Sequence, residues 1–161
     1  LVSLIKDTDI KILDTRKTLP AYRVLDKYAV KTGGGTNHRM GLYDMIMIKD
    51  NHIKAAGSIT NAVTKCRESY DNTYTIEVET TNLSEVEEAI AAKADIIMLD
   101  NMDKDTMKQA IAIIDKKAEI EVSGNMDESK INHIKDLKID YISIGALTHS
   151  VNAFDISMKF D

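Results

Sequence analysis

The sequence predicts an α/β fold, an incomplete (open) parallel β/α barrel of about six strands. Short β-branched runs alternate with amphipathic stretches along the chain, which is typical of βα units and a parallel sheet. Polar residues or glycines stand at the end of nearly every run. This favours a barrel, in which all strands end at one functional face, over a doubly wound sheet with a single switch point. Because six runs fall short of eight, we expect the barrel to be incomplete.

The predicted strands are residues 10–13, 45–48, 74–79, 96–99, 120–123 and 141–144. Their carboxyl ends carry, in order, Asp14, Lys49, Glu79, Asp100, Ser123 and Gly145. A last apolar stretch, residues 153–158, is predicted to be a further strand or a docking tail.

The first helix is predicted to begin near Thr18, a possible cap, and Pro20, and to end at glycines 33–35. Its apolar stripe would consist of Val24, Leu25, Tyr28 and Ala29. Apolar residues at helical spacing predict four further helices, which contain residues 59–66, 83–90, 107–114 and 131–137.

The composition limits the classes of function. The chain has 161 residues, which suits one domain, and its net charge of −5 argues against nucleic-acid binding. A single cysteine favours a reducing compartment, so we expect a cytoplasmic protein, and no apolar run approaches the roughly 20 residues of a membrane span. The chain opens on Leu1 rather than methionine, so we expect a part of something longer.

Positive charge is concentrated in residues 11–54, which hold nine Lys/Arg and four Asp/Glu, whereas the other residues hold twelve and twenty-two. Such a basic island in an acidic protein predicts an anion site. The alternative, a solvated helix face, suits Arg23, Lys27 and Lys31 but does not explain the cations beside strand ends and glycines. For His38 we expect a hydrogen bond to an anionic substrate.

Two glycine turns follow neighbouring late strands, Ser123-Gly124-Asn125 and Gly145-Ala146. Together they indicate a phosphate held by backbone N–H groups, although either turn alone would be ordinary turn chemistry.

Glu77 and Glu79 point to the same side of their strand, and Asp100 ends the next one. These carboxylates suit a Mg²⁺ ion whose other ligands are phosphate oxygens and water. Alternatively, they neutralise the nearby cations as buried ion pairs.

The chain also carries, in order, DTRKTLPAYR (14–23), KYAVKTGGGTNHR (27–39), MIMIKDNHI (45–53), EVET (77–80), LDN (99–101), SGN (123–125) and SIGALTHS (143–150). Together these segments closely resemble the quinolinate phosphoribosyltransferases, the carboxylating nicotinate-nucleotide pyrophosphorylases, over essentially the whole chain. The resemblance implies a type II phosphoribosyltransferase-like open barrel. It also implies an enzyme of NAD biosynthesis that converts quinolinate and phosphoribosyl pyrophosphate, with Mg²⁺, to nicotinate mononucleotide, pyrophosphate and CO₂.

The resemblance also implies roles for individual residues. The quinolinate carboxylates and neighbouring phosphate charge would be held by Arg16, Lys17, His38, Arg39 and Lys49. The ribose hydroxyls and Mg²⁺ would face Glu79 and Asp100, with Mg²⁺ held by these two residues directly or indirectly. The two glycine turns would bind the 5′-phosphate. We expect the catalytic residues to be Lys17, Lys49, Glu79 and Asp100.

One departure from the family concerns domain organisation. Its members carry an N-terminal α/β domain that closes the barrel and, in a homodimer, supplies an arginine to the partner's site, and residues 1–161 match only the C-terminal catalytic barrel. We therefore expect little turnover from this chain alone. The alternatives are a related phosphoribosyltransferase that uses nicotinate, and a non-catalytic phosphate-binding or dimerisation module.

Overall fold

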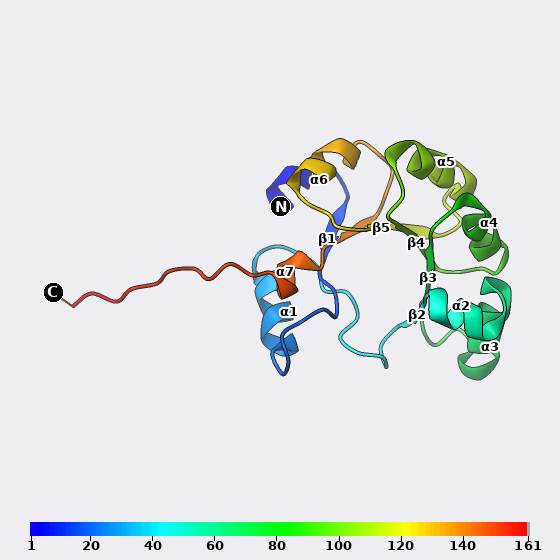
Figure 1. Cartoon of the computed structure of the whole chain (residues 1–161), viewed down its shortest axis with the longest axis horizontal. Helices are drawn as coiled ribbons and strands as arrows, with labels where there is room; N and C mark the ends of the chain where they lie inside the picture. The colour runs from blue at the N-terminus through cyan, green and yellow to red at the C-terminus, as the bar shows by residue number, and fades with distance from the viewer. Residues whose placement is uncertain (161) are drawn as a thin grey trace.

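Six parallel strands form one open, curved sheet in the computed structural model, which describes residues 1–160 (Figure 1). The strands are β1 (Lys11–Leu13), β2 (Ile46–Ile48), β3 (Ile76–Thr80), β4 (Ile96–Asp100), β5 (Glu119–Ser123) and β6 (Tyr141–Ser143). They lie in the order β1-β6-β5-β4-β3-β2, and every pairing is parallel. All six predicted strands are confirmed, with ends shifted by two residues or fewer.

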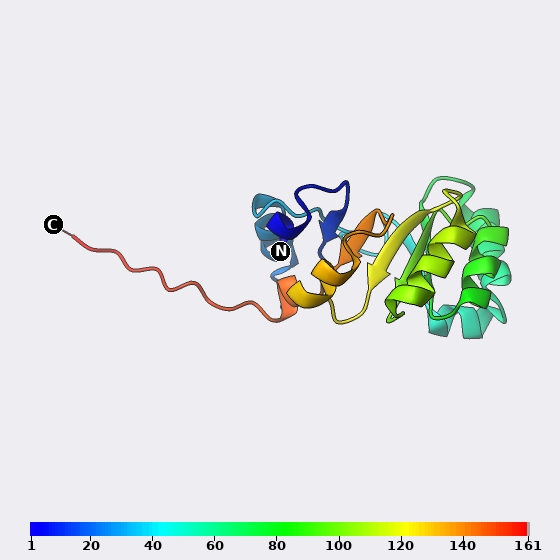
Figure 2. The same cartoon turned by 90° about the horizontal axis from the view of Figure 1, so that it is seen from above.

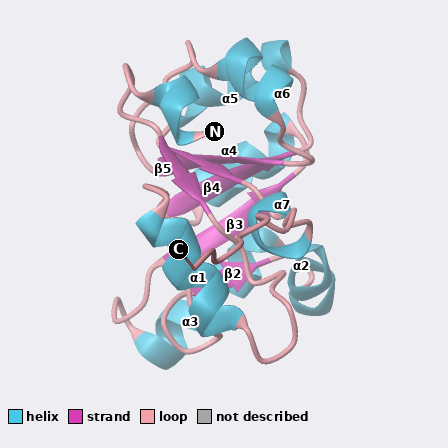
Figure 3. Ribbon diagram, turned by 90° about the vertical axis from the view of Figure 1, so that its left-hand side faces the viewer, coloured by secondary structure: helices cyan, strands magenta, loops and turns pink. Residues whose placement is uncertain are grey.

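The helices lie mainly along the outer side of this curved sheet. They are the 3₁₀ helix η1 (Val2–Ile5) and α1 (Arg23–Thr32), α2 (Asp50–Ala56), α3 (Ile59–Tyr70), α4 (Leu83–Ala91), α5 (Lys104–Ile114), α6 (Glu128–Ile134) and α7 (Ala146–His149). Helices α2 to α6 follow one another around the outside of the arc, while α1 and α7 lie together near its β1 end (Figures 1 and 3). Helix α2 was not predicted, because Ile53 is the only large apolar residue in it and so no apolar spacing marks the helix.

The strand order decides between the two architectures that the sequence allowed. Neighbours in the sheet are neighbours in the chain, and β1 pairs with the last strand, β6. A doubly wound sheet would reverse direction at a switch point, and this sheet does not. The fold is therefore an open barrel, as predicted, and the structure places the opening between β1 and β2.

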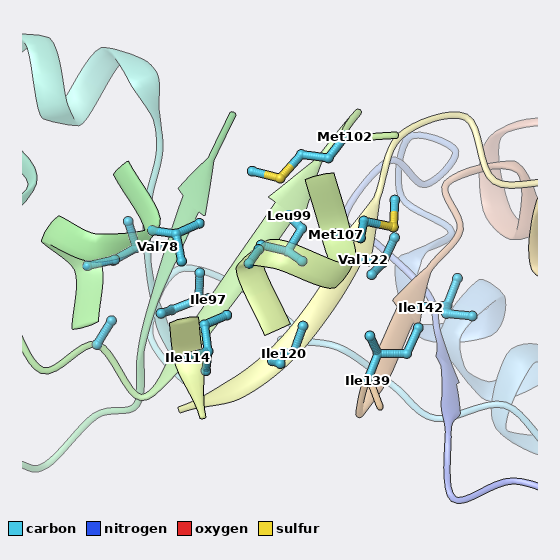
Figure 4. Close-up of a cluster of buried hydrophobic side chains, with 14 of the residues drawn as sticks. Val78, Ile97, Leu99, Met102, Met107, Ile114, Ile120, Val122, Ile139 and Ile142 are labelled. Atoms are coloured by element: carbon cyan, nitrogen blue, oxygen red, sulfur yellow. The ribbon is translucent and has the colours of Figure 1, made fainter. Parts of the chain in front are cut away.

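The apolar core fills the space between the sheet and its outer helices (Figure 4). Val78, Ile97 and Val122 on the strands are each 0% exposed and pack in one cluster with Met107 and Ile114 of α5. Each such side chain contributes about 1.5–3 kcal/mol by burial. Strand residues alternate between faces, so the opposite, concave face is left to polar side chains such as Glu77, Glu121 and Ser143.

Helix α1 contradicts the predicted packing. Val24, Leu25 and Tyr28 are 67%, 60% and 69% exposed, whereas Lys27, expected in solvent, is 1% exposed. The helix also begins at Arg23 and has no side-chain cap from Thr18. Ala21 explains the late start, because its φ of 63° is left-handed and cannot belong to the helix.

Residues 151–160 form no strand and extend away from the body of the molecule (Figures 1 and 2). The strand predicted within 153–158 is therefore wrong for this chain, because no neighbouring strand pairs with its backbone. The docking-tail alternative stays a prediction. Among residues 1–160, no helix has the length and apolar character needed to cross a bilayer.

Candidate active site

A pocket of about 320 Å³ opens at the carboxyl edge of the sheet. Its lining includes six residues that the sequence singled out, namely Arg16, Lys17, His38, Arg39, Lys49 and Ser123. They come from the ends of β1, β2 and β5 and from the loop that precedes β2. The fold therefore gathers the cations of the basic island into one cavity.

A larger hollow of about 1370 Å³ lies at the opposite edge, around Asp9, Asp95 and Asp140. It is bordered by the segments that lead into the strands, whereas parallel α/β folds place their ligands at the carboxyl ends. We therefore take the smaller pocket as the functional site.

The cationic side chains of the pocket are only partly neutralised by neighbouring groups of the same chain. Burial lowers the pKa of Arg39, and the nearby Arg16 lowers it further. Arg39 donates to the carbonyl oxygen of Met45 at 3.0 Å, a neutral acceptor, and the buried Nε of Arg16 has no hydrogen-bond partner among residues 1–160. Lys49 pairs with Glu79. The uncompensated guanidinium groups make this cavity suited to an anion.

His38 lies at the floor of the pocket against two buried glutamates. Its Nε2 is 3.0 Å from Glu77 Oε2 and 3.3 Å from Glu121 Oε2, and its Nδ1 accepts the backbone N–H of Arg39 at 2.7 Å. Both ring nitrogens thus have protein partners. The hydrogen bond to a substrate anion that we predicted for His38 would need one of these contacts to be exchanged.

The cluster of His38, Glu77 and Glu121 could geometrically hold a metal ion, since one ligand atom from each lies within 4.8 Å of the others. Its hydrogen bonding argues otherwise. A metal-binding histidine normally donates from its second ring nitrogen, whereas Nδ1 here accepts an N–H. The three groups are better described as a proton-sharing cluster.

Burial opposes the charge on His38, but hydrogen bonds to Glu121 and Glu77 outweigh it and raise the histidine pKa to about 9. Burial also raises the pKa of Glu77 to about 7. The N–H received at Nδ1 favours the neutral Nε2–H imidazole, so we place the retained proton on Glu77 rather than on the ring. With either assignment, the folded cluster binds more protons near pH 7 than the unfolded chain does.

This excess of protons predicts a pH dependence. Because the native state binds more protons, the free energy of unfolding should fall as pH rises from about 4.5 through 7. Glu77→Gln removes the titrating carboxyl. Between about pH 4.5 and 7, the free energy of unfolding of wild type should therefore fall by about 1–3 kcal/mol relative to that of the variant. Denaturant unfolding at stepped pH measures the difference. The control Glu87→Gln changes an exposed acid on α4 and should give a constant offset; equal pH profiles for the two variants would contradict the prediction.

The two predicted glycine turns lie side by side, because β5 pairs with β6. None of the backbone N–H groups of Gly124, Asn125, Gly145 and Ala146 donates to a backbone carbonyl among residues 1–160. Gly124 has a left-handed φ of 115°, and a Cβ on it would lie 2.9 Å from the backbone nitrogen of Asn101. The first turn is thus tightly built against the end of β4.

Glu79 and Asp100 both face the concave side at the ends of adjacent strands. The carboxylate of Glu79 is paired with Lys49, and Asp100 accepts a hydrogen bond from Asn101 at 2.8 Å. In the sheet, Asp100 lies opposite Ser123, the first residue of the first glycine turn. Two carboxylates at neighbouring strand ends beside a glycine turn are ligands of the kind that Mg²⁺ takes, namely one or two carboxylates plus substrate oxygens.

Five lining residues were missed from the sequence, namely Thr15, Met47, Met98, Glu121 and Ser143. Strand alternation signals four of them, for example Glu121, which shares one face of β5 with Ser123. The burial of that acid beside His38 depends on a contact between residues distant in the chain.

An open β/α barrel with cations, carboxylates and glycine turns at its carboxyl edge places this protein in the class of parallel β/α barrels whose candidate sites lie at that edge. Residues 1–159 match the family model described as "Quinolinate phosphoribosyl transferase, C-terminal domain". The chain belongs to that family.

The relatives that match are about twice as long as this chain. A probable carboxylating nicotinate-nucleotide pyrophosphorylase of Bacillus subtilis is 48% identical over 157 residues, 98% of this chain and 54% of the relative. The crystal structure of NadC from Streptococcus pyogenes has 48% identity and a TM-score of 0.94 over 99% of this chain and 56% of that one. The corresponding Francisella tularensis structure has 49% identity and a TM-score of 0.93, and it covers 97% and 55% of the two chains. The chain therefore spans about half the length of the curated relatives it matches.

Proposed function

We propose that this chain is the catalytic barrel of a quinolinate phosphoribosyltransferase, a pentosyltransferase of NAD biosynthesis. The single observation that carries the proposal is the cation pocket at the carboxyl edge, where Arg16, Lys17, Arg39 and Lys49 converge. Family membership and the names of the relatives support the same activity.

Quinolinate is a pyridine with two adjacent carboxylates. The guanidinium groups of Arg16 and Arg39 can each donate paired hydrogen bonds to a carboxylate, and Lys17 and Lys49 add point charges. Two arginines suit a dicarboxylate better than the single carboxylate of nicotinate. We propose that Met47 and Met98, which also line the pocket, pack against the apolar ring of the substrate.

We propose that the phosphoribosyl group lies along the β4, β5 and β6 end of the site. The backbone N–H groups of Ser123-Gly124-Asn125 and Gly145-Ala146 would bind its 5′-phosphate, and Glu79 and Asp100 would face the ribose hydroxyls. Glu79 and Asp100 would also hold Mg²⁺, which neutralises charge on the pyrophosphate when it is bound.

In the proposed reaction the pyridine nitrogen attacks the anomeric carbon of phosphoribosyl pyrophosphate. The new C–N bond forms as the C–O bond to pyrophosphate breaks, and the departing pyrophosphate keeps that electron pair. The ring nitrogen is then quaternary, so the C2–carboxylate bond can break with its electrons left on C2 while CO₂ departs. A proton from solvent then adds to C2 and completes nicotinate mononucleotide. The protein contributes mainly by orienting two polyanions and by matching the changing charge.

A binding experiment tests the substrate class. We expect the chain to bind quinolinate at least about tenfold more tightly than nicotinate, because the monocarboxylate leaves one partly buried guanidinium without a partner. Calorimetry with each acid, in the presence and absence of Mg²⁺ and phosphoribosyl pyrophosphate, measures this ratio. Tighter binding of nicotinate would instead support the related phosphoribosyltransferase.

Pyrophosphate release in the presence of both substrates tests catalysis. We expect turnover well below that of a full-length relative, because residues 1–161 correspond to about half the length of the curated relatives. Full rates would contradict this expectation. No binding of phosphoribosyl pyrophosphate, with or without Mg²⁺, would favour the non-catalytic module. The homodimer expected from the resemblance stays a prediction.

A further inference from the structure

Helix α1 turns its charged face toward the protein and its apolar face outward. Arg23 and Lys27 stand four residues apart and therefore share one face, and Lys27 is 1% exposed while the adjacent Tyr28 is 69% exposed. Burying a lysine is costly unless its charge and all its donors are matched. The orientation of α1 must therefore be set by specific polar partners and not by apolar burial.

Lys27 has such partners in the two loops that carry the pocket cations. It forms an ion pair with Asp14, which is 0% exposed, and donates to the carbonyl oxygen of His38 at 2.9 Å. Asp14 in turn accepts the backbone N–H of His38 at 2.9 Å and the side chain of Asn37 at 2.6 Å. Both polar groups of the His38 backbone are thus held by one buried ion pair.

Arg23 makes a second connection between the same loops, one turn earlier on α1. Its guanidinium donates to the carbonyl oxygen of Arg16 at 3.3 Å and to that of Met40 at 3.3 Å. Its Nε also donates to the hydroxyl of Thr18 at 3.2 Å. One helix face therefore joins the loop after β1 to the loop before β2.

These loops need an external support. Residues 14–22 and 37–45 contain neither helix nor strand, yet they carry Arg16, Lys17 and Arg39. The positive charges repel one another, and the proximity of Arg16 disfavours the charged form of Arg39. Without a bound anion, this repulsion acts to separate the two loops.

We propose that Asp14, Arg23 and Lys27 are positioning residues that hold the two cation-bearing loops together before an anion binds. They touch backbone and not substrate, so their effect is preorganisation of the pocket. This proposal explains how the pocket of the proposed function is kept in shape. The experiments that measure quinolinate binding rest on the proposed function.

The test compares Lys27→Met with Lys31→Met in the 161-residue chain. Both variants remove one positive charge from α1, but Lys31 is exposed. In the ligand-free chain, the backbone amide of His38 should exchange hydrogen about tenfold faster in Lys27→Met, while exchange in β3, β4 and β5 and the Lys31→Met profile stay unchanged. Unchanged exchange at His38 would overturn the proposal.

A double variant separates positioning from stability. Lys27→Met alone leaves the buried Asp14 without its cation, whereas Asp14→Asn/Lys27→Met removes both charges and should recover the melting temperature. Quinolinate binding, measured by calorimetry, should remain about tenfold or more weaker than wild type in the double variant, because the His38 carbonyl still lacks its donor. Recovery of affinity together with stability would show a purely structural pair and overturn the proposal.

The two readouts also separate this proposal from the proposed function. If wild type fails to bind quinolinate, the proposed function fails, and the amide exchange of His38 still decides the positioning role. If wild type binds and Lys27→Met binds equally well with unchanged exchange, the positioning role alone fails.

Discussion

Replacing Arg39 or Lys49 with alanine is expected to weaken quinolinate binding by a factor of about 10 to 100. Each removes a charge-assisted contact, worth about 1.5–3 kcal/mol, from a pocket whose other cations cannot move into the vacated position. Calorimetric titration of each variant with quinolinate measures the loss. Thermal unfolding of the same samples confirms that the fold is retained.

The matched control for these variants is Lys31→Ala, which removes the same charge from an exposed position on α1. Arg23, which the sequence placed on a solvated face, is unsuitable because it donates to the carbonyl oxygens of Arg16 and Met40. We expect Lys31→Ala to bind quinolinate as wild type does. An equal loss of affinity in all three alanine variants would mean that the basic region acts only through its overall charge.

The second large effect is expected from Gly124→Ala, which should abolish measurable binding of phosphoribosyl pyrophosphate and lower stability by about 1–3 kcal/mol. Gly124 has a φ of 115°, and an added Cβ would lie 2.7 Å from Cγ and 2.9 Å from the backbone nitrogen of Asn101. That nitrogen donates to the carbonyl oxygen of Ser123 at 3.0 Å, so moving it disturbs the turn itself. Calorimetry and thermal unfolding measure the two losses.

Gly57→Ala is the control for the backbone conformation. Gly57 also has a left-handed φ, 91°, but the nearest atom to its added Cβ would be 3.7 Å away, in Asn61. This variant should therefore show the backbone strain alone and bind phosphoribosyl pyrophosphate normally. If the two variants behave alike, the close approach to Asn101 has no functional importance.

Much of the fold was predictable because its signals are local. Each strand is a short apolar run closed by a polar residue, and the alternation of strands with helices specified the parallel sheet. The candidate site followed from the same rule, because parallel strands place Asp14, Lys49 and Glu79 at one edge whatever the intervening helices do.

The failures share a different origin. The stripe of Val24, Leu25 and Tyr28 correctly predicted an amphipathic helix, but periodicity does not tell which face meets the protein. The answer depended on Asp14, thirteen residues before Lys27 in the chain. The contact between His38 and Glu77, thirty-nine residues apart, was equally invisible.

By itself, the sequence determined the six β/α units, the basic island and the two glycine turns, because these depend on residue type and on spacing within single elements. The tertiary structure alone decided that α1 is held by its charged face, that Glu121 lies beneath His38, and that the barrel stays open between β1 and β2. These features depend on contacts between residues that are distant in the chain. Such contacts form because buried charges must neutralise one another and because the strands pair in a particular order. Neither cause is visible in a local sequence pattern.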